Sequence, residues 1–365
     1  MTAVPGNSPS TAGPRSWQSL KAIAIPVATV IATLAIGLAL IGLTGASIPD
    51  AIDAFIEGTF GSGYVIAASI NRAVAYALVA LGFIVAARAN LTNVGGEGQI
   101  AIGGMTATAL ALYGGVKGLP LGLAFILPML AAIFTGALWG GLAGFLKVKS
   151  GTNEVISTLL LTFIGIWMLY GSVESVDLLR RPMTTTATLP ESLEIPDATK
   201  LPLLTGDPSA PLNIGLPIAI VLAGLVWLVL TRSVFGWRLR AVGLNELASR
   251  RAGIPYNSTI VAAMAIAGGF GGLTGAIMLQ GDQFVLKSGF SSGYGFDGLV
   301  IGLLARGSTA GVIAASLLFG FLRSGGINME MEAQVPSAIV MVIQGMIVVT
   351  IAGIAFWSER GKASR

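Results

Sequence analysis

Cysteine and histidine are both absent from the 365 residues of this chain. Their absence excludes disulfide bonds, thiolate nucleophiles, imidazole proton relays and Cys/His zinc sites. Charged residues are also scarce, at 10% of the chain against about 25% in an ordinary soluble domain. With 54% hydrophobic residues and a mean hydropathy of +0.83, the chain has too few charges to cover a soluble core. The composition therefore excludes a soluble enzyme.

Ten apolar runs follow one another along the chain, near residues 22–43, 69–87, 98–115, 121–145, 153–172, 214–231, 259–280, 297–305, 309–323 and 335–357. A helix needs about 20 apolar residues to span a bilayer, and continuous runs exclude the alternating strands of a porin. We therefore predict an all-α polytopic membrane protein with about ten transmembrane helices. The run at 297–305 is short and has glycines around it, which favours a broken or re-entrant helix.

The charges between the runs predict the orientation, because lysine and arginine collect on the cytoplasmic side of membrane proteins. The segment 232–258 has five arginines and one acid, whereas 173–213 has six acids, three bases and six prolines. We predict a cytoplasmic tail over 1–20, a membrane domain over 21–357 and a second cytoplasmic tail over 358–365. Within the membrane domain, 173–213 lies outside the cell and 232–258 inside it. The same rule explains the net charge of +4 without a nucleic-acid partner.

Two glycine-rich turns each place one acid at the start of a helix. Residues 93–99 read Asn-Val-Gly-Gly-Glu-Gly-Gln, and residues 293–298 read Gly-Tyr-Gly-Phe-Asp-Gly. The predicted topology puts the first turn near the inside and the second near the outside. Opposed orientation of similar elements is typical of inverted repeats, whose interface commonly houses a transport path.

A carboxylate inside the membrane costs about 2.5–3.5 kcal/mol and usually faces a cavity or a partner. We therefore expect four polar residues on or beside a translocation path: Asn93, Glu97, Gln99 and Asp297. Two structural alternatives stay open. The glycines could form a tight helix-packing seam, and Glu97 could form an ion pair with Arg88 or Arg72.

The basic segment 232–258 contains signals for a short helix of its own. Asn245 is a favourable N-cap and Gly253 a favourable C-terminal stop, which predicts an amphipathic helix of about two turns between them. Arginines that only fix the topology do not require such a capped helix between two long spans.

Four motifs, in this order, resemble the permease subunits of ABC importers. They are the turn at 93–99, Ser-Gly-Thr-Asn-Glu-Val-Ile-Ser-Thr at 150–158, the segment from Gly243 to Ile254, and the turn at 293–298. The resemblance covers about residues 69–357 and is greatest to the nucleoside and simple-sugar permeases, which are related to the ribose and branched-chain amino-acid permeases. It implies the permease fold of that family and a place in the bacterial cytoplasmic membrane.

The resemblance also implies partners. These are a second permease chain in a heterodimer, a cytoplasmic ABC ATPase and an extracytoplasmic substrate-binding protein. The residues that it assigns to ATPase coupling are Gly243, Asn245, Ala248, Arg250, Arg251, Ala252 and Gly253. This chain departs from the family pattern at Glu246, where proline is common, and at Arg251, where tyrosine is common.

No Gly-x-x-x-x-Gly-Lys-Ser/Thr motif occurs, so ATP must be bound by a partner. The expected protein is a transport subunit with no catalytic residue, cofactor or metal of its own. An ion-coupled secondary transporter is the alternative, with Glu97 and Asp297 as coupling carboxylates, but it does not require the capped basic helix. Nucleosides, sugars and amino acids all stay open as substrates.

Overall fold

The computed structural model describes residues 31–32, 35–120, 122–182, 189–336, 338–346, 349–350 and 353. This part of the chain is helical, with three isolated β-bridges and no strand. The chain divides into two units, one of residues 1–53 and 329–365 and the other of residues 54–328. The expected tails, 1–20 and 358–365, and residues 22–30 of the first apolar run lie outside the described residues.

The labelled helices are α2 (Ile48–Phe60), α3 (Gly63–Arg88), α4 (Gly96–Tyr113), α5 (Leu123–Ser150), α6 (Glu154–Glu174), α7 (Gly215–Arg232), α8 (Val234–Leu244), α9 (Glu246–Arg251), α10 (Tyr256–Met278), α11 (Tyr294–Leu304) and α12 (Thr309–Glu332). Residues 35–43 and 338–346 are also helical. A π-helical turn, Leu279–Gln283, continues α10. Six of the described helices are long and apolar enough to cross a membrane, or seven spans if the bent pair Ala35–Leu43 and α2 is one. The all-helical fold is therefore confirmed, whereas the number of about ten transmembrane helices stays a prediction.

Each described apolar run coincides with a helix, but α2 and α8 were not predicted. No apolar run is predicted within 44–68, yet 13 residues of this segment form α2. The three acids of α2, Asp50, Asp53 and Glu57, interrupt its apolar positions. An amphipathic helix of this kind has too little continuous apolar sequence to be found as a run.

α3 and α10 form the centre of the second unit, and most of their residues are buried. α5, α6 and α7 instead expose large apolar side chains, including Phe134, Trp167 and Val221. A helix that is apolar on its outer face is stable when that face contacts lipid. Burial thus separates the central helices from those at the periphery of this unit.

Glycine seams bring the backbones of the central helices together. A Cβ on Gly140 of α5 would lie 2.9 Å from the Cα of Gly268 in α10, and one on Gly136 would lie 2.7 Å from the Cα of Gly272. Small residues at such crossings allow the backbones of the two helices to approach each other closely. The helix-packing alternative for the glycines of the first turn is correct for Gly98 and Gly103 of α4, which pack in the same way against the backbones of Thr162 in α6 and Gly272 in α10.

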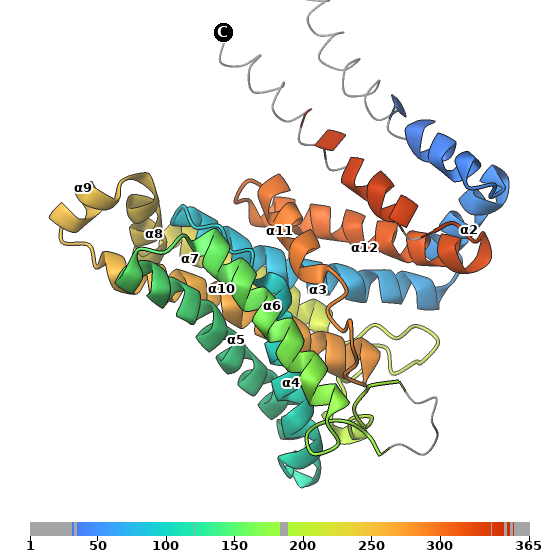
Figure 1. Cartoon of the computed structure of the whole chain (residues 1–365), viewed down its shortest axis with the longest axis horizontal. Helices are drawn as coiled ribbons and strands as arrows, with labels where there is room; N and C mark the ends of the chain where they lie inside the picture. The colour runs from blue at the N-terminus through green and yellow to red at the C-terminus, as the bar shows by residue number, and fades with distance from the viewer. Residues whose placement is uncertain are drawn as a thin grey trace, which may run out of the picture. The chain divides into compact units, whose positions relative to one another are not determined.

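The two ends of the second unit collect different segments of the chain (Figure 1). At one end, Nε2 of Gln280 donates hydrogen bonds to the carbonyl oxygens of Phe125 (3.0 Å) and Thr199 (2.8 Å). The start of α5, the segment 175–214 and the end of α10 therefore meet there. At the opposite end, α8 packs against the end of α3, because a Cβ on Gly243 would lie 3.0 Å from the carbonyl carbon of Ala89.

Candidate translocation site and coupling surface

α4 and α11 begin side by side at about half the height of α3. A Cβ on Gly96, at the start of α4, would lie 3.2 Å from Cγ1 of Val79, and a Cβ on Gly298 of α11 would lie 2.6 Å from the same atom. Val79 lies in the middle part of α3. The two glycine-rich turns therefore meet inside the helical unit, well away from both of its ends.

α11 runs in the same direction as α3 from this meeting point. Gly298 packs against Val79, and Gly302, one turn later, packs against Phe83. Beyond the helix, a Cβ added to Gly307 would lie 3.3 Å from Nε of Arg88, at the end of α3. The 11 residues of α11 therefore extend from mid-height to one end only, as expected for a broken or re-entrant helix.

α4 leaves the meeting point in the opposite direction. Its residues Gln99 and Gly104 pack against Gly271 and Gly275 of α10, in that order, so α4 and α10 run parallel. α10 is antiparallel to α3. Gly82 near the end of α3 packs against Phe270, whereas Asn71 near the start of α3 is linked through Asn213 to Gly281, in the turn that continues α10. α4 and α11 are thus two helices that start together and diverge.

Glu97 joins the two starting points. Its Oε1 accepts a 2.7 Å hydrogen bond from the backbone N–H of Gly293, and its Oε2 accepts a 2.6 Å bond from Gly295. These N–H groups belong to the first turn of α11, where a helix has unsatisfied donors and a partial positive charge. Glu97 is 4% exposed, so the first turn of α11 supplies the partners that a buried carboxylate needs.

Asn93 and Gln99 satisfy each other. Nδ2 of Asn93 donates to Oε1 of Gln99 at 3.1 Å, and Nε2 of Gln99 donates back at 3.2 Å. Asn93 Oδ1 also accepts a 2.9 Å bond from the N–H of Gly95. This buried amide pair fixes the turn that leads into α4, and thereby the position of Glu97.

Asp297 lies near Glu97 but bonds to a different helix. Its Oδ2 accepts a 3.1 Å hydrogen bond from the hydroxyl of Tyr76, and the ring of Tyr76 stacks on Tyr294 with centroids 4.6 Å apart. Asp297 thus attaches the first turn of α11 to the middle of α3. The aromatic partner was not among the expected site residues, because one tyrosine in an apolar run carries no local signal.

The alternative of an ion pair between Glu97 and Arg88 or Arg72 is not present in the part of the chain that the structure describes. Arg88 donates from Nη2 to the carbonyl oxygen of Gly307 at 2.9 Å, and Arg72 donates from Nη1 to the hydroxyl of Ser324 at 2.7 Å. Both arginines instead bind elements that lie 200 or more residues away in the chain.

A cavity of about 150 Å³ borders Glu97. It lies between α4, α6 and the loop before α11, and its lining is Glu97, Ala101, Ile166, Leu169, Tyr170, Gly289, Phe290, Ser291 and Ser292. Gly104 leaves room for the ring of Phe290, since an added Cβ would lie 3.0 Å from its Cζ. The structure therefore brings one of the four candidate path residues, Glu97, to the wall of a cavity that has both polar and aromatic groups.

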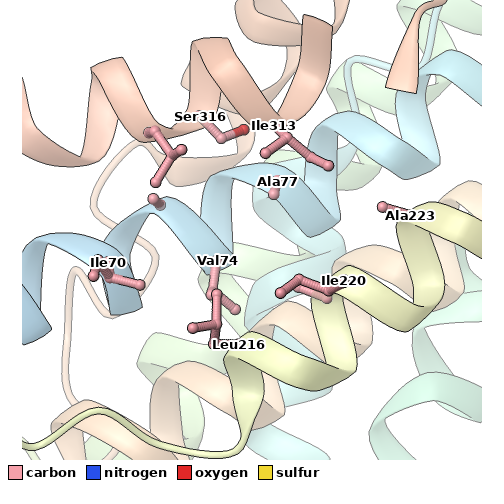
Figure 2. A pocket seen from close by; sticks show the side chains of 11 residues that line it. Ile70, Val74, Ala77, Leu216, Ile220, Ala223, Ile313 and Ser316 are labelled. Atoms are coloured by element: carbon pink, nitrogen blue, oxygen red, sulfur yellow. The ribbon is translucent and has the colours of Figure 1, made fainter. Parts of the chain in front are cut away.

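A second cavity, of about 50 Å³, lies between α3, α7 and α12 (Figure 2). Its lining is almost entirely aliphatic, with Val74, Leu216 and Ile313 among the side chains that face it. The buried hydroxyl of Ser316 has no hydrogen-bond partner among the described residues. With one hydroxyl and no charge, this cavity does not offer the groups that bind a polar solute.

The predicted short helix in the basic segment is confirmed as α9. Asn245 caps it, because its Oδ1 accepts a 2.9 Å hydrogen bond from the N–H of Ala248. Gly253 ends it at φ +76°, a conformation that glycine adopts without strain. The helix is short, with six residues, and its neighbour α8 was not expected.

Arg250 and Arg251 are both exposed, and Arg250 also bonds to other residues of the chain. The guanidinium of Arg250 bonds to Glu246 at 3.1 Å and to Asn257 at 3.1 Å, and it lies 4.1 Å from the ring centroid of Tyr256. These contacts tie α9 to the first turn of α10. Leu247, Leu244 and Arg251 present an apolar and basic surface to the outside of the unit.

The segment 175–214 closes the opposite end of the unit through backbone contacts. The N–H groups of Ser192 and Leu201 donate to the carbonyl oxygens of Leu286 and Gln280, both at 2.8 Å. On its surface, hydrogen bonds to Asp197 and Glu194 raise the pKa of Lys200. The segment is thus fixed to the end of α10.

These features define a helical membrane permease with a polar site where two helices diverge. The family model described as branched-chain amino acid transport system / permease component matches residues 65–352, and the chain belongs to this family.

Three relatives make the family relationship more specific. The chain is 31% identical to the guanosine ABC transporter permease protein NupP of Bacillus subtilis, over 91% of this chain and 94% of the relative. It is 34% identical to the glucose ABC transporter permease protein TsgB13 of Haloferax volcanii, over 88% of this chain and 85% of the relative. It is 26% identical to a second Bacillus subtilis protein, the guanosine ABC transporter permease protein NupQ, over 71% of this chain and 81% of the relative. No solved structure matches the chain.

Proposed function

We propose that this chain is the permease subunit of an ATP-driven importer that carries a nucleoside or a related small polar solute. Membership of the permease family supports the transport role, and the relatives named for guanosine and glucose support an uncharged, hydroxyl-bearing substrate class. The observation that carries the proposal is the meeting of α4 and α11 at mid-height, with Glu97 beside a cavity.

The diverging pair α4 and α11 supports an inverted arrangement of the two glycine-rich turns. In transporters, such broken helices place their polar ends near the bilayer midplane, where substrate passes. Asn93, Glu97, Gln99 and Asp297 belong to this region in the proposal, with Glu97 on the path and the other three as supports that fix its position. Glu97 already bonds two backbone donors, which argues against its use as an ion-coupling group.

The proposed orientation has ten crossings and both termini in the cytoplasm of a bacterial cell, with 173–213 outside. Arginines and lysines support it, since the end of the unit that holds α8 and α9 also holds Arg88, Lys147 and Lys149. Positive residues accumulate on the cytoplasmic side.

The proposed partners follow from the orientation. An ABC ATPase binds the coupling surface, which we define as Gly243, Asn245, Ala248, Arg250, Arg251, Ala252 and Gly253 together with the exposed Leu244 and Leu247. A second permease chain completes the path, and two Bacillus subtilis relatives with guanosine permease names support a heterodimer. A substrate-binding protein delivers solute at the end closed by 175–214.

Co-purification with the ATPase and uptake by proteoliposomes test the proposal. Proteoliposomes are reconstituted with the permease pair and the ATPase, and the binding protein is added. They are expected to accumulate radiolabelled nucleoside only when ATP is present on the side of the membrane that holds the ATPase. Uptake driven by a proton or sodium gradient without ATP would instead identify a secondary transporter.

A further inference from the structure

We propose that the cavity beside Glu97 binds uncharged solutes that carry hydroxyl groups, with the Glu97 carboxylate as their hydrogen-bond acceptor. This inference rests on the proposed import function and adds to it a location on the path and a chemical rule for selection.

Glu97 has acceptor capacity beyond its two backbone bonds. An ionised carboxylate offers about four lone-pair sites, and Gly293 and Gly295 occupy one on each oxygen. The same side chain lines the cavity. Glu97 can therefore hold the start of α11 and receive a hydroxyl or N–H group of a solute at the same time.

The rest of the lining suits a flat or ring-shaped polar group. The hydroxyl of Ser292 donates to the carbonyl oxygen of Gly289 at 2.6 Å, and its oxygen keeps lone pairs that can accept a hydrogen bond from a solute. Ser291 adds a second hydroxyl, and Phe290 and Tyr170 add aromatic surface. Aromatic faces pack well against sugar rings and nucleobases, and hydroxyl groups need acceptors in a water-poor site.

The cavity size fits one ring rather than a whole nucleoside. Its volume of about 150 Å³ is close to that of an engineered protein cavity, about 150 Å³, that holds benzene. A nucleoside would therefore present its sugar or its base to the cavity, one at a time.

The charge in the cavity disfavours anions. Glu97 is the one charged residue in its lining, and its carboxylate offsets the partial positive charge at the start of α11. Arg323 approaches the same loop, 3.5 Å from the carbonyl oxygen of Ser292, without lining the cavity. A solute with a phosphate group would meet the negative charge of Glu97 at short range.

The absence of native cysteine gives a direct test. In the full reconstituted transporter, Ser292→Cys places one thiol in the chain at the cavity wall. We expect a cationic methanethiosulfonate reagent to label it about tenfold faster than an anionic one, and we expect guanosine or glucose delivered by the binding protein to slow the labelling several-fold. Glu97→Gln in the same background is expected to abolish the preference for the cationic reagent.

Ser209→Cys is the matched control, because Ser209 is an exposed serine of the segment 175–214. Its labelling is expected to be independent of Glu97 and of substrate. If both reagents label Ser292→Cys equally and neither solute protects it, the cavity proposal is overturned. The import function still stands in that case, provided that ATP-driven uptake is observed. If the Ser292→Cys variant does not assemble into the transporter, Ala101→Cys, on the α4 wall of the cavity, is labelled in the same way. The results that support or overturn the proposal are the same for this variant. Loss of ATP-dependent uptake by the unsubstituted chain would instead contradict the import function itself.

Discussion

The backbone N–H of Gly295 donates a 2.6 Å hydrogen bond to Oε2 of Glu97, although the two residues are 198 positions apart in the chain. The contact links the two glycine-rich turns that the sequence analysis identified separately. Gly295 also packs on the backbone of Glu97, since an added Cβ would lie 2.5 Å from its Cα. The start of α11 therefore depends on α4 for both its cap and its packing surface.

Gly295→Ala is expected to disrupt this junction. The new methyl group collides with backbone atoms of Gly96 and Glu97, which cannot move as a flexible side chain can. Overpacking of this kind costs about 1–3 kcal/mol. We expect a lower thermal unfolding temperature of the purified permease and strongly reduced uptake.

Gly224→Ala in α7 is the control, because an added Cβ at Gly224 meets nothing within 4 Å. Alanine is the better helix former by about 1 kcal/mol, so this variant is expected to keep both stability and uptake. Equal behaviour of the two variants would show that α11 can move away from α4 without loss.

Glu97→Gln is expected to reduce substrate uptake at normal expression. Glutamine keeps one acceptor oxygen, but its NH₂ group replaces the oxygen that binds the second backbone donor, which leaves a buried N–H without a partner. Such a loss costs about 1–3 kcal/mol. Asp297→Asn keeps an acceptor for the hydroxyl of Tyr76, and we expect a smaller effect on uptake. If neither substitution changes uptake, both acids are structural groups outside the path.

The sequence predicted the positions of the helices better than their contacts. Apolar runs locate α3, α5 and α10 because the bilayer requires continuous apolar sequence. Glu97 was correctly expected to need a partner, since a buried carboxylate is costly. An ion pair with Arg88 or Arg72 was one open alternative, because opposite charge is visible in a sequence. The N–H groups at the start of a distant helix, which are the actual partners, leave no such local signal.

The same limit explains what was found and missed in the basic segment. Asn245 and Gly253 act on neighbours within a few residues, so the cap and the stop of α9 could be predicted from their spacing. The contact of Gly243 with the end of α3 joins residues more than 150 positions apart. No local pattern encodes such a contact.

Gly243→Ala is expected to uncouple ATP hydrolysis from transport. An added Cβ would lie 2.5 Å from the carbonyl oxygen of Arg88 and 3.0 Å from Ala89, so α8 must move away from the end of α3. Arg88 also holds Gly307, which follows α11, so the displaced contact joins α8 to the site helices. We expect normal ATPase association with little substrate-stimulated hydrolysis. Full stimulation would contradict this mechanical role.

The orientation predicts which side of the membrane labels each end of the unit. Single cysteines at Lys200 and Ser258 are both at surface positions, in the segment 175–214 and near the start of α10. In intact cells, an impermeant maleimide is expected to label Lys200→Cys directly, and Ser258→Cys only after permeabilisation. Labelling of residue 200 from the cytoplasm alone would reverse the proposed orientation.

The double substitution Arg250→Ala with Arg251→Ala is expected to leave membrane insertion intact, weaken ATPase association and abolish substrate-stimulated hydrolysis. The single substitutions separate two causes. Arg251→Ala removes an exposed charge, which can form a charge-assisted hydrogen bond to an acid of the ATPase, worth about 1.5–3 kcal/mol. Arg250→Ala removes the internal contacts with Glu246 and Asn257, so α9 loses its attachment to α10.

We therefore expect Arg251→Ala to lower ATPase affinity by tenfold or more in a pull-down titration. The Arg250→Ala variant should instead bind the ATPase with nearly normal affinity but show little substrate-stimulated ATP hydrolysis. Leu247→Ala, which truncates an exposed apolar side chain on the same helix, should resemble Arg251→Ala, because the lost contact is again with the partner. Wild-type stimulation in the double variant, at normal membrane levels, would show that these arginines fix the topology and take no part in coupling.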